Sequence, residues 1–446
     1  MTDPSAPPRT TTLEPRTTRV RFRVFTMAFA ADLLNYGVRV SISVAAPFIL
    51  EEFDFSPFTW GLILSAFFWT YAPAALLGGI MADRIGVRRA YLIAMLIWSI
   101  SLPLTASAWN FGAFMVARLL FGVGEGPMMP ISTKITANWF PRRRTASMLN
   151  LIQSGTTVGP ILATPFVVWM ATTLGWRESF VILGALGLVW TIIWARVGRD
   201  NPAEHPKVSA SELEYITADH NVGGAVTTED STSRAEFWKL LRSPYIAALA
   251  FGYFCYAWVL FMFLTWYPQY LVEARGVDKS DLAGIATIPW ITATLGLVGG
   301  GLVAARLVCR TGSLVSARQF VVVVGLLGAG LSFGPSPFIT SPTAGLVLLS
   351  TATFFLLASF QYQALIVAVT PSNYTGRAAG TIQLVASSAG MLAPIVTGAI
   401  VEVTGSYTPA FVVGGGLSIC GALAVGIFGR TKWLRGAAQV PEPAKS

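Results

Sequence analysis

Long apolar runs, separated by short polar turns, fill most of this chain. Each run is long enough to cross the ~30 Å hydrocarbon core of a bilayer as a helix, which takes about 20 residues. Helices are expected because lipid offers no hydrogen bonds to an open backbone. The pattern predicts an all-α membrane protein with twelve transmembrane helices, over residues 24–48, 57–80, 90–107, 111–136, 146–170, 179–197, 244–272, 283–305, 319–335, 343–370, 378–401 and 408–428.

One long polar segment, residues 198–243, interrupts these runs and leaves six predicted spans on either side. Similar turns, "GGIMADRIGVRR" and "GGGLVAARLVCRTG", follow the second and the eighth spans, as expected of an internally repeated transporter. Within the segment, "SASELEYI" has the form of a capping box and predicts a short surface helix. The predicted domains are an N-tail (1–23), two six-helix bundles (24–197 and 244–428), a central loop (198–243) and a C-tail (429–446).

The distribution of charged residues along the chain predicts the topology of the helices in the membrane. Only 12% of the residues are charged, against about 25% in soluble domains. The net charge of +9 comes mostly from the two tails, the central loop and the turns on one side, whereas the other side holds only Arg177, Arg275 and Lys279. This asymmetry predicts a multi-pass protein of the inner cell membrane with both termini in the cytoplasm. The basic excess therefore reflects topology and does not indicate a nucleic-acid partner.

Other classes of chemistry find little support. The cysteines Cys255, Cys309 and Cys420 lack metal-ligand spacing and fit small packing residues better. A metal site at His205 and His220 is possible, but a solvated loop explains both better. With no histidine in a span, no serine motif beside a base, and no strand–loop–helix context for a cofactor, we expect neither an enzyme nor a cofactor. A ligand sensor would need a signalling domain, for which the tails and loop are too short.

The turn after the second span resembles the loop motif of the major facilitator superfamily. Within that superfamily, the chain resembles the anion:cation symporters, which carry sugar acids and other organic anions. The resemblance extends through "ARLLFGVGEGP", "NWFPRRRTA", "QSGTTVGP" and "FLTWYPQYLVEARG". It implies two six-helix bundles that work by alternating access, with a cytoplasmic charge lock as the gating motif. The motif residues are Gly79, Asp83, Arg84, Gly86, Arg88 and Arg89; in the equivalent second-half turn Ala305 replaces the acid.

The resemblance also implies a substrate site and a proton site. The proton carrier is Glu125, and the substrate-binding residues are Tyr36, Arg39, Tyr71, Arg118, Thr156, Gln383 and Ser387. Several positions depart from the family pattern. Val38 stands where the family has a proton-carrying aspartate, Thr156 replaces a glutamine, and Gln383 and Ser387 replace asparagines. Ala257 and Phe261 replace a polar pair. These departures leave the coupling ion and the substrate open.

The charges within the predicted spans can also be placed by depth. They are confined to the first half: Asp32, Arg39, Arg118, Glu125 and Lys134. An ionised group at mid-bilayer costs at least ~2.5–3.5 kcal/mol, so such groups usually face a partner or a wet cavity. Lys134 lies near a span end and can snorkel.

The other four charges fall into two layers. The two arginines lie roughly 12–15 Å below the outer ends, and each acid lies seven residues, or roughly 10 Å, deeper on its own helix. The spacing predicts an upper cationic layer and a lower acidic layer. Alternatively, the arginines pair with the acids to hold the helices together.

We therefore expect secondary active transport of a small organic anion, with proton symport. Arg39 and Arg118 would bind a carboxylate, because the planar fork of arginine suits it. Asp32 would replace the proton site lost at Val38 and act beside Glu125; in the simpler alternative, Glu125 acts alone. The other expected partner is the lipid bilayer, and we expect a monomer. A second functional hypothesis is a proton-independent facilitator, or an exporter of an organic anion or drug-like compound. The apolar replacements favour a less hydroxylated acid as substrate.

Overall fold

The fold is known from a computed structural model, which describes residues 18–218, 234–370 and 375–429. The described residues form helices joined by turns, without a strand. Eleven helices among them are long and apolar enough to cross a membrane. The expectations for the N-tail up to residue 17, for His220 and for the C-tail beyond residue 429 lie outside the described residues.

The first half of the chain forms eight helices. The α1 helix is the longest and contains three of the residues expected at the site, Asp32, Tyr36 and Arg39. The bounds are α1 Val20–Glu52, α2 Pro57–Ile85, α3 Val87–Ala106, α4 Phe111–Glu125, α5 Met128–Trp139, α6 Arg142–Gln153, α7 Gly155–Thr173 and α8 Trp176–Val197.

The described part of the connecting segment, on either side of residues 219–233, forms three short helices: η1 (Pro202–Glu204), α9 (Ala210–Thr217) and α10 (Arg234–Leu241). The second half then contains α11 Pro244–Glu273, η2 Lys279–Asp281, α12 Leu282–Ile285, α13 Ile288–Thr311, α14 Leu314–Phe333, η3 Ser336–Phe338, α15 Pro342–Ala358, α16 Tyr362–Val369, α17 Thr375–Thr404 and α18 Thr408–Phe428.

The fourth predicted span, 111–136, is broken in two. It forms α4, of 15 residues, and α5, of 12, which meet at Gly126 and Pro127. Neither piece alone reaches the roughly 20 residues of a full span, so eleven long helices are found where twelve spans were predicted. Proline breaks the helix because it has no N–H to donate and its ring clashes with the preceding turn. The fifth span has only a turn at Ser154 between α6 and α7, and the two pieces together form one helix long enough to cross the membrane, Arg142–Thr173.

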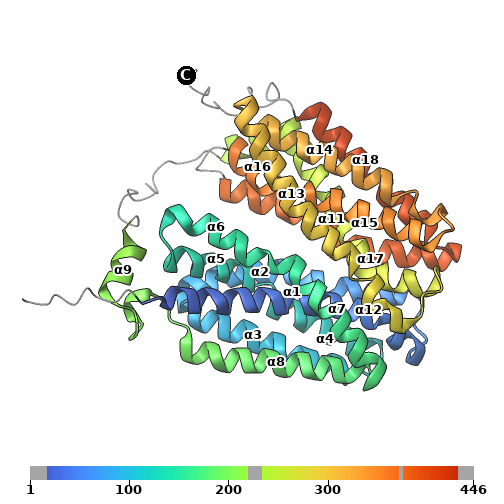
Figure 1. The fold of residues 1–446 in the computed structure, drawn as a ribbon, viewed down its shortest axis with the longest axis horizontal. Helices are drawn as coiled ribbons and strands as arrows, with labels where there is room; N and C mark the ends of the chain where they lie inside the picture. Colours follow the sequence, from blue (N-terminus) through green and yellow to red (C-terminus); the bar gives the residue numbers. More distant parts are fainter. Residues whose placement is uncertain (1–17, 219–233, 371–374, 430–446) are drawn as a thin grey trace, which may run out of the picture.

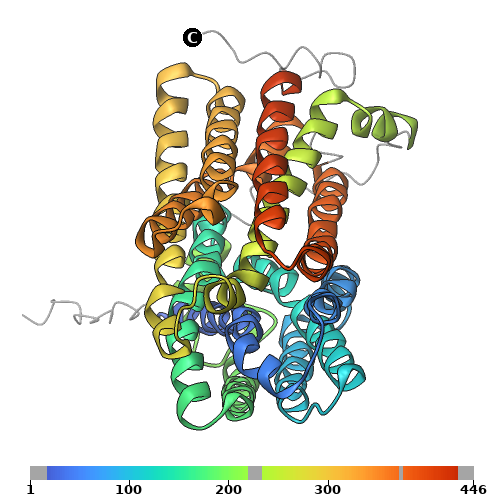
Figure 2. The same cartoon turned by 90° about the vertical axis from the view of Figure 1, so that its right-hand side faces the viewer.

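Two helical bundles, one from each half of the chain, lie side by side (Figure 1). They come together near α12 and diverge towards the end where α9 lies, and Figure 2 shows the same two groups from the side. We call the region near α12, where the two bundles come together, the joined end; it contains Glu51, Phe58, Lys279 and Glu402. There Lys279 of η2 forms an ion pair with Glu51 of α1, and the Phe58 N–H donates to Glu402 of α17 at 2.9 Å. Both contacts connect the two halves.

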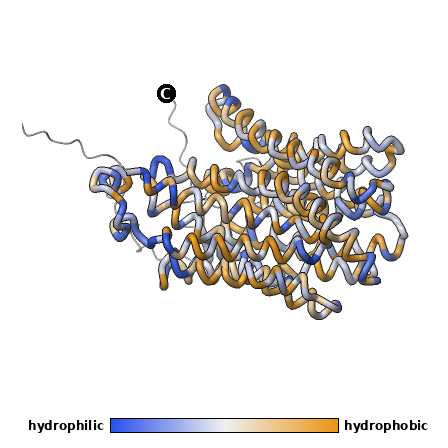
Figure 3. Tube along the Cα trace, turned by 60° about the horizontal axis from the view of Figure 1, so that its bottom comes forward, coloured by the Kyte–Doolittle hydropathy of each residue, from blue (hydrophilic) through white to orange (hydrophobic). Residues whose placement is uncertain are grey.

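The outer surface of the bundles is apolar along the helices. Leu295, Leu331 and Val347 are among many large hydrophobic side chains that are exposed there. Hydrophilic segments gather near the α9 end of the molecule (Figure 3). An exposed surface of this kind is stable only in contact with lipid, because it is far larger than the apolar patches of soluble proteins. The expected all-α membrane fold is confirmed.

The α9 helix is capped as predicted, and it also docks on the start of α1. Ser209 accepts a hydrogen bond from the Glu212 N–H at 3.2 Å. The Glu212 side chain is fully buried and accepts hydrogen bonds from the Val20 N–H at 3.0 Å and from the Arg21 guanidinium at 3.0 Å. A carboxylate at a helix N-terminus satisfies free N–H groups and the helix dipole. This contact fixes the connecting segment to the first half of the chain.

Candidate functional site

A buried ion pair joins α1 to α4 at the centre of the predicted site. Arg39 donates from Nε to Glu125 Oε1 at 2.7 Å, and its Nη2 donates to the same oxygen. Asn35, oriented with its amide nitrogen towards the acid, lies 2.7 Å from Glu125 Oε2. Only 5% of Arg39 and 1% of Glu125 are exposed, so the pair is shielded from solvent. Asn35 was missed in the sequence because its amide has no charge to make it stand out among the spans.

Aromatic rings surround the Arg39 guanidinium. Its carbon lies 4.4 Å from the ring centre of Tyr36, and 5.1 Å from those of Phe67 and Tyr71. Rings at this distance attract a cation through their electron-rich faces. The structure thus brings together Tyr36, Arg39, Tyr71 and Glu125, from α1, α2 and α4, as the sequence predicted.

Arg118 of α4 is different, because it has no hydrogen-bond partner among the described residues. Only 5% of the residue is exposed, and its Nε is fully enclosed and unsatisfied. The guanidinium lies over the rings of Phe67 and Phe121, at 5.3 and 5.1 Å. Leaving a charge buried and unpaired costs several kcal/mol. Arg118 is therefore the group in this cluster that most needs an anion.

Asp32 of α1 is the acidic counterpart of Arg118. It is 7% exposed, forms no hydrogen bond or ion pair with the described residues, and keeps Oδ2 enclosed. It lies beside the start of α7, where a Cβ on Gly155 would be only 2.7 Å from Oδ2. Thr156, the predicted substrate residue next to Gly155, is half-buried in the first turn of α7.

The ion pair between Arg39 and Glu125 therefore connects the predicted cationic layer with the predicted acidic layer. Asp32 and Arg118 do not form a second such pair. Side chains on a helix lean towards its N-terminus. The sequence predicts that α1 and α4 run in opposite directions, so Arg39 leans deeper and Glu125 leans back, and the two meet. By the same rule Asp32 and Arg118 lean away from that pair, each in its own direction. This accounts for two charges that are paired and two that are not.

A second polar cluster lies in the other half of the chain. The Tyr253 hydroxyl of α11 and the Gln363 amide of α16 donate to Gln383 Oε1 at 3.0 and 3.1 Å. Gln383 in turn donates to Ser387 at 3.5 Å on α17. The predicted residues Gln383 and Ser387 are thus in one network. Tyr253 and Gln363 were missed in the sequence, where the only signal was a polar side chain within an apolar run.

The two clusters face each other across the halves. Between them the rings of Phe68 on α2 and Phe261 on α11 are in contact, with centres 4.5 Å apart. Phe261, which replaces a polar family residue, therefore packs against the opposite half.

The sequence model of the Major Facilitator Superfamily matches residues 28–394. The chain belongs to the Major Facilitator Superfamily. It is accordingly a transporter of the membrane and not an enzyme.

Curated relatives and solved structures agree with this membership. The chain is 33% identical over 405 residues to the hexuronate transporter of Bacillus subtilis, covering 90% of this chain and 93% of that protein. It is 35% identical over 392 residues to the probable sulfoacetate transporter SauU of Cupriavidus necator, covering 88% and 90%. A bacterial homolog of the human lysosomal transporter Spinster has the same fold, with a TM-score of 0.72 at 19% identity, over 96% of this chain and all of that one.

The superfamily loop motif forms its contacts within the first half. Gly86 has a φ of 85°, which glycine adopts without strain, and it starts α3. The next turn is held by Asp200, which accepts from the Arg88 N–H at 2.8 Å. Asp83 pairs with Lys134 of α5 at 2.6 Å. Lys134 therefore has a partner at the helix end.

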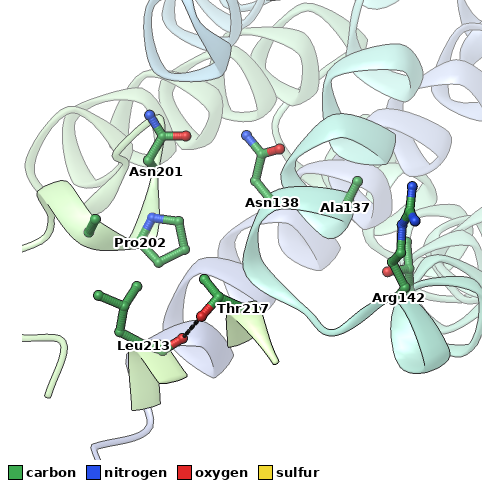
Figure 4. A pocket seen from close by; sticks show the side chains of 9 residues that line it. Ala137, Asn138, Arg142, Asn201, Pro202, Leu213 and Thr217 are labelled. Atoms are coloured by element: carbon green, nitrogen blue, oxygen red, sulfur yellow. Dashed lines mark hydrogen bonds between the residues drawn. The ribbon is translucent and has the colours of Figure 1, made fainter. Parts of the chain in front are cut away.

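A cavity of about 750 Å³ lies apart from this cluster, between α5, α6, η1 and α9 (Figure 4). Its labelled lining includes Asn138, Arg142, Asn201 and Thr217. None of the predicted substrate or proton residues lines it. It therefore belongs to the packing of the connecting segment and adds nothing to the predicted site.

Proposed function

We propose that this chain is a secondary active carrier of a small organic anion, and that Arg118 binds the anionic group. The observation that carries the proposal is a buried guanidinium without a hydrogen-bond partner beside a closed arginine–acid pair. A carboxylate would accept two parallel hydrogen bonds from such a fork. The curated relatives are named as carriers of organic anions, which supports the same class of substrate.

Proton coupling would act through the Arg39–Glu125 pair. While Glu125 is ionised, it neutralises Arg39, so the site offers the substrate one unpaired guanidinium. Once Glu125 takes up a proton, the attraction between the two side chains falls, and Arg39 becomes available to the anion as well. Proton and anion would therefore favour each other's binding, which is the thermodynamic requirement of a symporter.

The orientation that we propose follows the charge asymmetry of the sequence. The α9 end would face the cytoplasm, and the joined end the outside. The halves would then be closed outside and open inwards, which is one of the two states of an alternating-access cycle. A reporter fused to either terminus and detected on the outer surface of intact cells would contradict this topology.

We favour a substrate with few hydroxyl groups. The resemblance to the anion:cation symporters places a polar pair at positions 257 and 261, where this chain has Ala257 and Phe261. Ala257 is buried, and Phe261 packs on Phe68. An apolar wall discriminates poorly in favour of hydroxyls. The 35% identical relative is named for sulfoacetate, which has no hydroxyl on its carbon chain, whereas the hexuronate transporter is 33% identical. If the substrate does carry hydroxyl groups, the hydrogen-bond network around Gln383 is where they would bind.

A transport assay in proteoliposomes tests the proposal directly. Labelled sulfoacetate, D-glucuronate and benzoate are each offered with an inward proton gradient, with a sodium gradient, and with neither. Accumulation of one acid that requires the proton gradient and is lost in Arg118→Gln supports the proposal. Equal uptake with and without the gradient would instead favour the second hypothesis, a facilitator or an exporter, to which the missing acid at Val38 points.

A further inference from the structure

We infer that Asp32 is a second proton-binding site, separate from the Arg39–Glu125 pair and placed where α1 meets the start of α7. This inference rests on the proposed function for its role in transport, but the site itself can be tested without any substrate. With Asp32 and Glu125, the carrier would have two proton-binding acids within the helices of its first half, although position 38 is a valine.

The contacts of Asp32 set it apart from the other buried acids. Glu125 is bound by Arg39, and Glu212 is satisfied by the start of α1. Asp32 is also buried, with 7% of the residue exposed, yet it forms no hydrogen bond or ion pair with any described residue. A buried carboxylate without a partner is costly, and the usual remedy is to bind a proton.

The surroundings of Asp32 also make its ionised form attainable. The side chain lies against Gly155, just after the turn at Ser154 that joins α6 to α7. Arg39 attracts a negative charge at Asp32, and Glu125 repels it. A site that transports a proton must tolerate both forms, and this position combines burial, which favours the neutral form, with Arg39, which favours the charged one.

The titratable groups that face Asp32 are few. Lys134 of α5 is engaged by Asp83, α6 carries its arginines at its start, and α7 contains no ionisable residue. The facing groups are Tyr36 and Arg39 on α1 itself, Tyr71 on α2, Tyr91 on α3 and Glu125 on α4. Of these, Glu125 is the only other carboxylic acid. Replacing Asp32 and Glu125 one at a time therefore shows which of the two carboxyl groups binds a proton.

The chemical step is the transfer of one proton from a hydronium ion to a carboxylate oxygen of Asp32. One O–H bond of the hydronium ion breaks, one O–H bond forms at Asp32, a water molecule is left, and the charge of the site rises by one. Release on the other side reverses the step. Sodium is the competing occupant, and it would need several oxygen ligands around Asp32.

Infrared titration of the purified protein in nanodiscs tests the inference. The carbonyl stretch of a protonated carboxylic acid is followed from alkaline to acid pH in the parent, Asp32→Asn, Glu125→Gln and Asp281→Asn. Asp281 is exposed at the joined end and serves as the matched control. We expect one component of the band to be absent in Asp32→Asn and present in the other two variants. If Asp32→Asn retains every component of the parent band, the inference is wrong.

Two further arms keep the result unambiguous. Asp32→Glu keeps a carboxyl group and should show the same component at a shifted frequency, which separates loss of the proton site from misfolding. Repeating the titration with sodium in place of choline tests the competing ion, and disappearance of the Asp32 component on adding sodium would contradict a proton site.

The transport arm separates this inference from the proposed function. In the proteoliposome assay, the number of protons moved per acid should fall by one in Asp32→Asn. An unchanged ratio would overturn the inference even if the parent is a symporter. If the parent carries none of the tested acids, the proposed function fails, while the infrared result still decides whether Asp32 binds a proton.

Discussion

The two halves of this transporter divide the work of the site between charge and neutral hydrogen bonding. The first half contains the buried charges Asp32, Arg39, Arg118 and Glu125. At the corresponding depth the second half offers Tyr253, Gln363, Gln383 and Ser387, all neutral, together with a wall of aromatic rings.

From this difference we propose that the first half binds the ion and the anionic group, whereas the second half contacts the rest of the substrate. Charged groups fix where a carboxylate binds, because each charge-assisted hydrogen bond contributes more binding free energy than a neutral one. This contribution changes with pH when one of the groups binds or loses a proton. Neutral amides and hydroxyls contribute about 1 kcal/mol each and discriminate by geometry. Mutations in the two halves should therefore have effects of different kinds as well as of different sizes.

The largest effect is expected from Arg118→Gln. The change removes a charged fork from a site where each charge-assisted hydrogen bond contributes about 1.5–3 kcal/mol, so binding of the transported acid should weaken about 100-fold or more. Isothermal titration calorimetry of the purified protein measures this. Arg310→Gln makes the same change at an exposed residue of α13 and should leave affinity unchanged. Equal affinity in parent and Arg118→Gln would show that the anion binds elsewhere.

The next effect in size is expected from Glu125→Gln, which removes the partner of Arg39. Accumulation driven by a pH gradient should fall, because one proton fewer moves with each acid, while exchange of acid at equal pH persists, because Arg39 and Arg118 both remain. An uncompensated buried Arg39 should also lower stability by about 3–5 kcal/mol. Adding the transported acid should restore part of this loss, as measured by thermal unfolding. The exposed Glu214→Gln of α9 is the control. Undiminished gradient-driven accumulation would remove Glu125 from the coupling mechanism.

A smaller effect, and one of a different kind, is expected from Tyr253→Phe in the second half. It deletes the hydroxyl that donates to Gln383 at 3.0 Å. A loss of about 1 kcal/mol corresponds to a change of roughly fivefold in KM, without a shift in the pH profile of transport. Competition by a series of acids should change in rank. Tyr215→Phe on α9 is the control, and a shifted pH profile in Tyr253→Phe would contradict the division of work between the halves.

The smallest effect is expected at the joined end, from Lys279→Met. Glu51 of this pair is largely exposed, with 70% of its side chain accessible, although Lys279 is only 23% accessible. Pairs open to solvent contribute about 0–1 kcal/mol, so the balance between closed and open states should shift about fivefold at most. Electron-spin distance measurements between labels at Ser147→Cys and Arg377→Cys report this balance near the α9 end. Lys207→Met, at an exposed residue of the connecting segment, is the control. A shift far larger than this would show that the pair is a principal gate.

Hydrophobic pattern alone was enough for the fold class. Runs of apolar residues long enough for a bilayer have one solution in lipid, because every backbone group must be paired within its own helix. The loop motif at Gly79 to Arg89 and the resemblance of the whole chain then identified the superfamily. What the pattern missed was the break of the fourth span at Gly126 and Pro127, since a sliding reading of hydrophobicity does not register where a helix bends.

The sequence also predicted that the buried charges of the first half gather together, because charges inside membrane spans are rare and costly and must face inwards. It missed the neutral residues Asn35, Tyr253 and Gln363. Which of those charges are paired was decided only by the tertiary structure. Arg39 meets Glu125, whereas Asp32 and Arg118 have no hydrogen-bond partner among the described residues. The lean of side chains towards the N-terminus of their helix agrees with this pairing, but it acts only between helix faces that packing has brought together. Depth along a helix can be counted in residues, whereas the faces that meet are set by the packing of the helices.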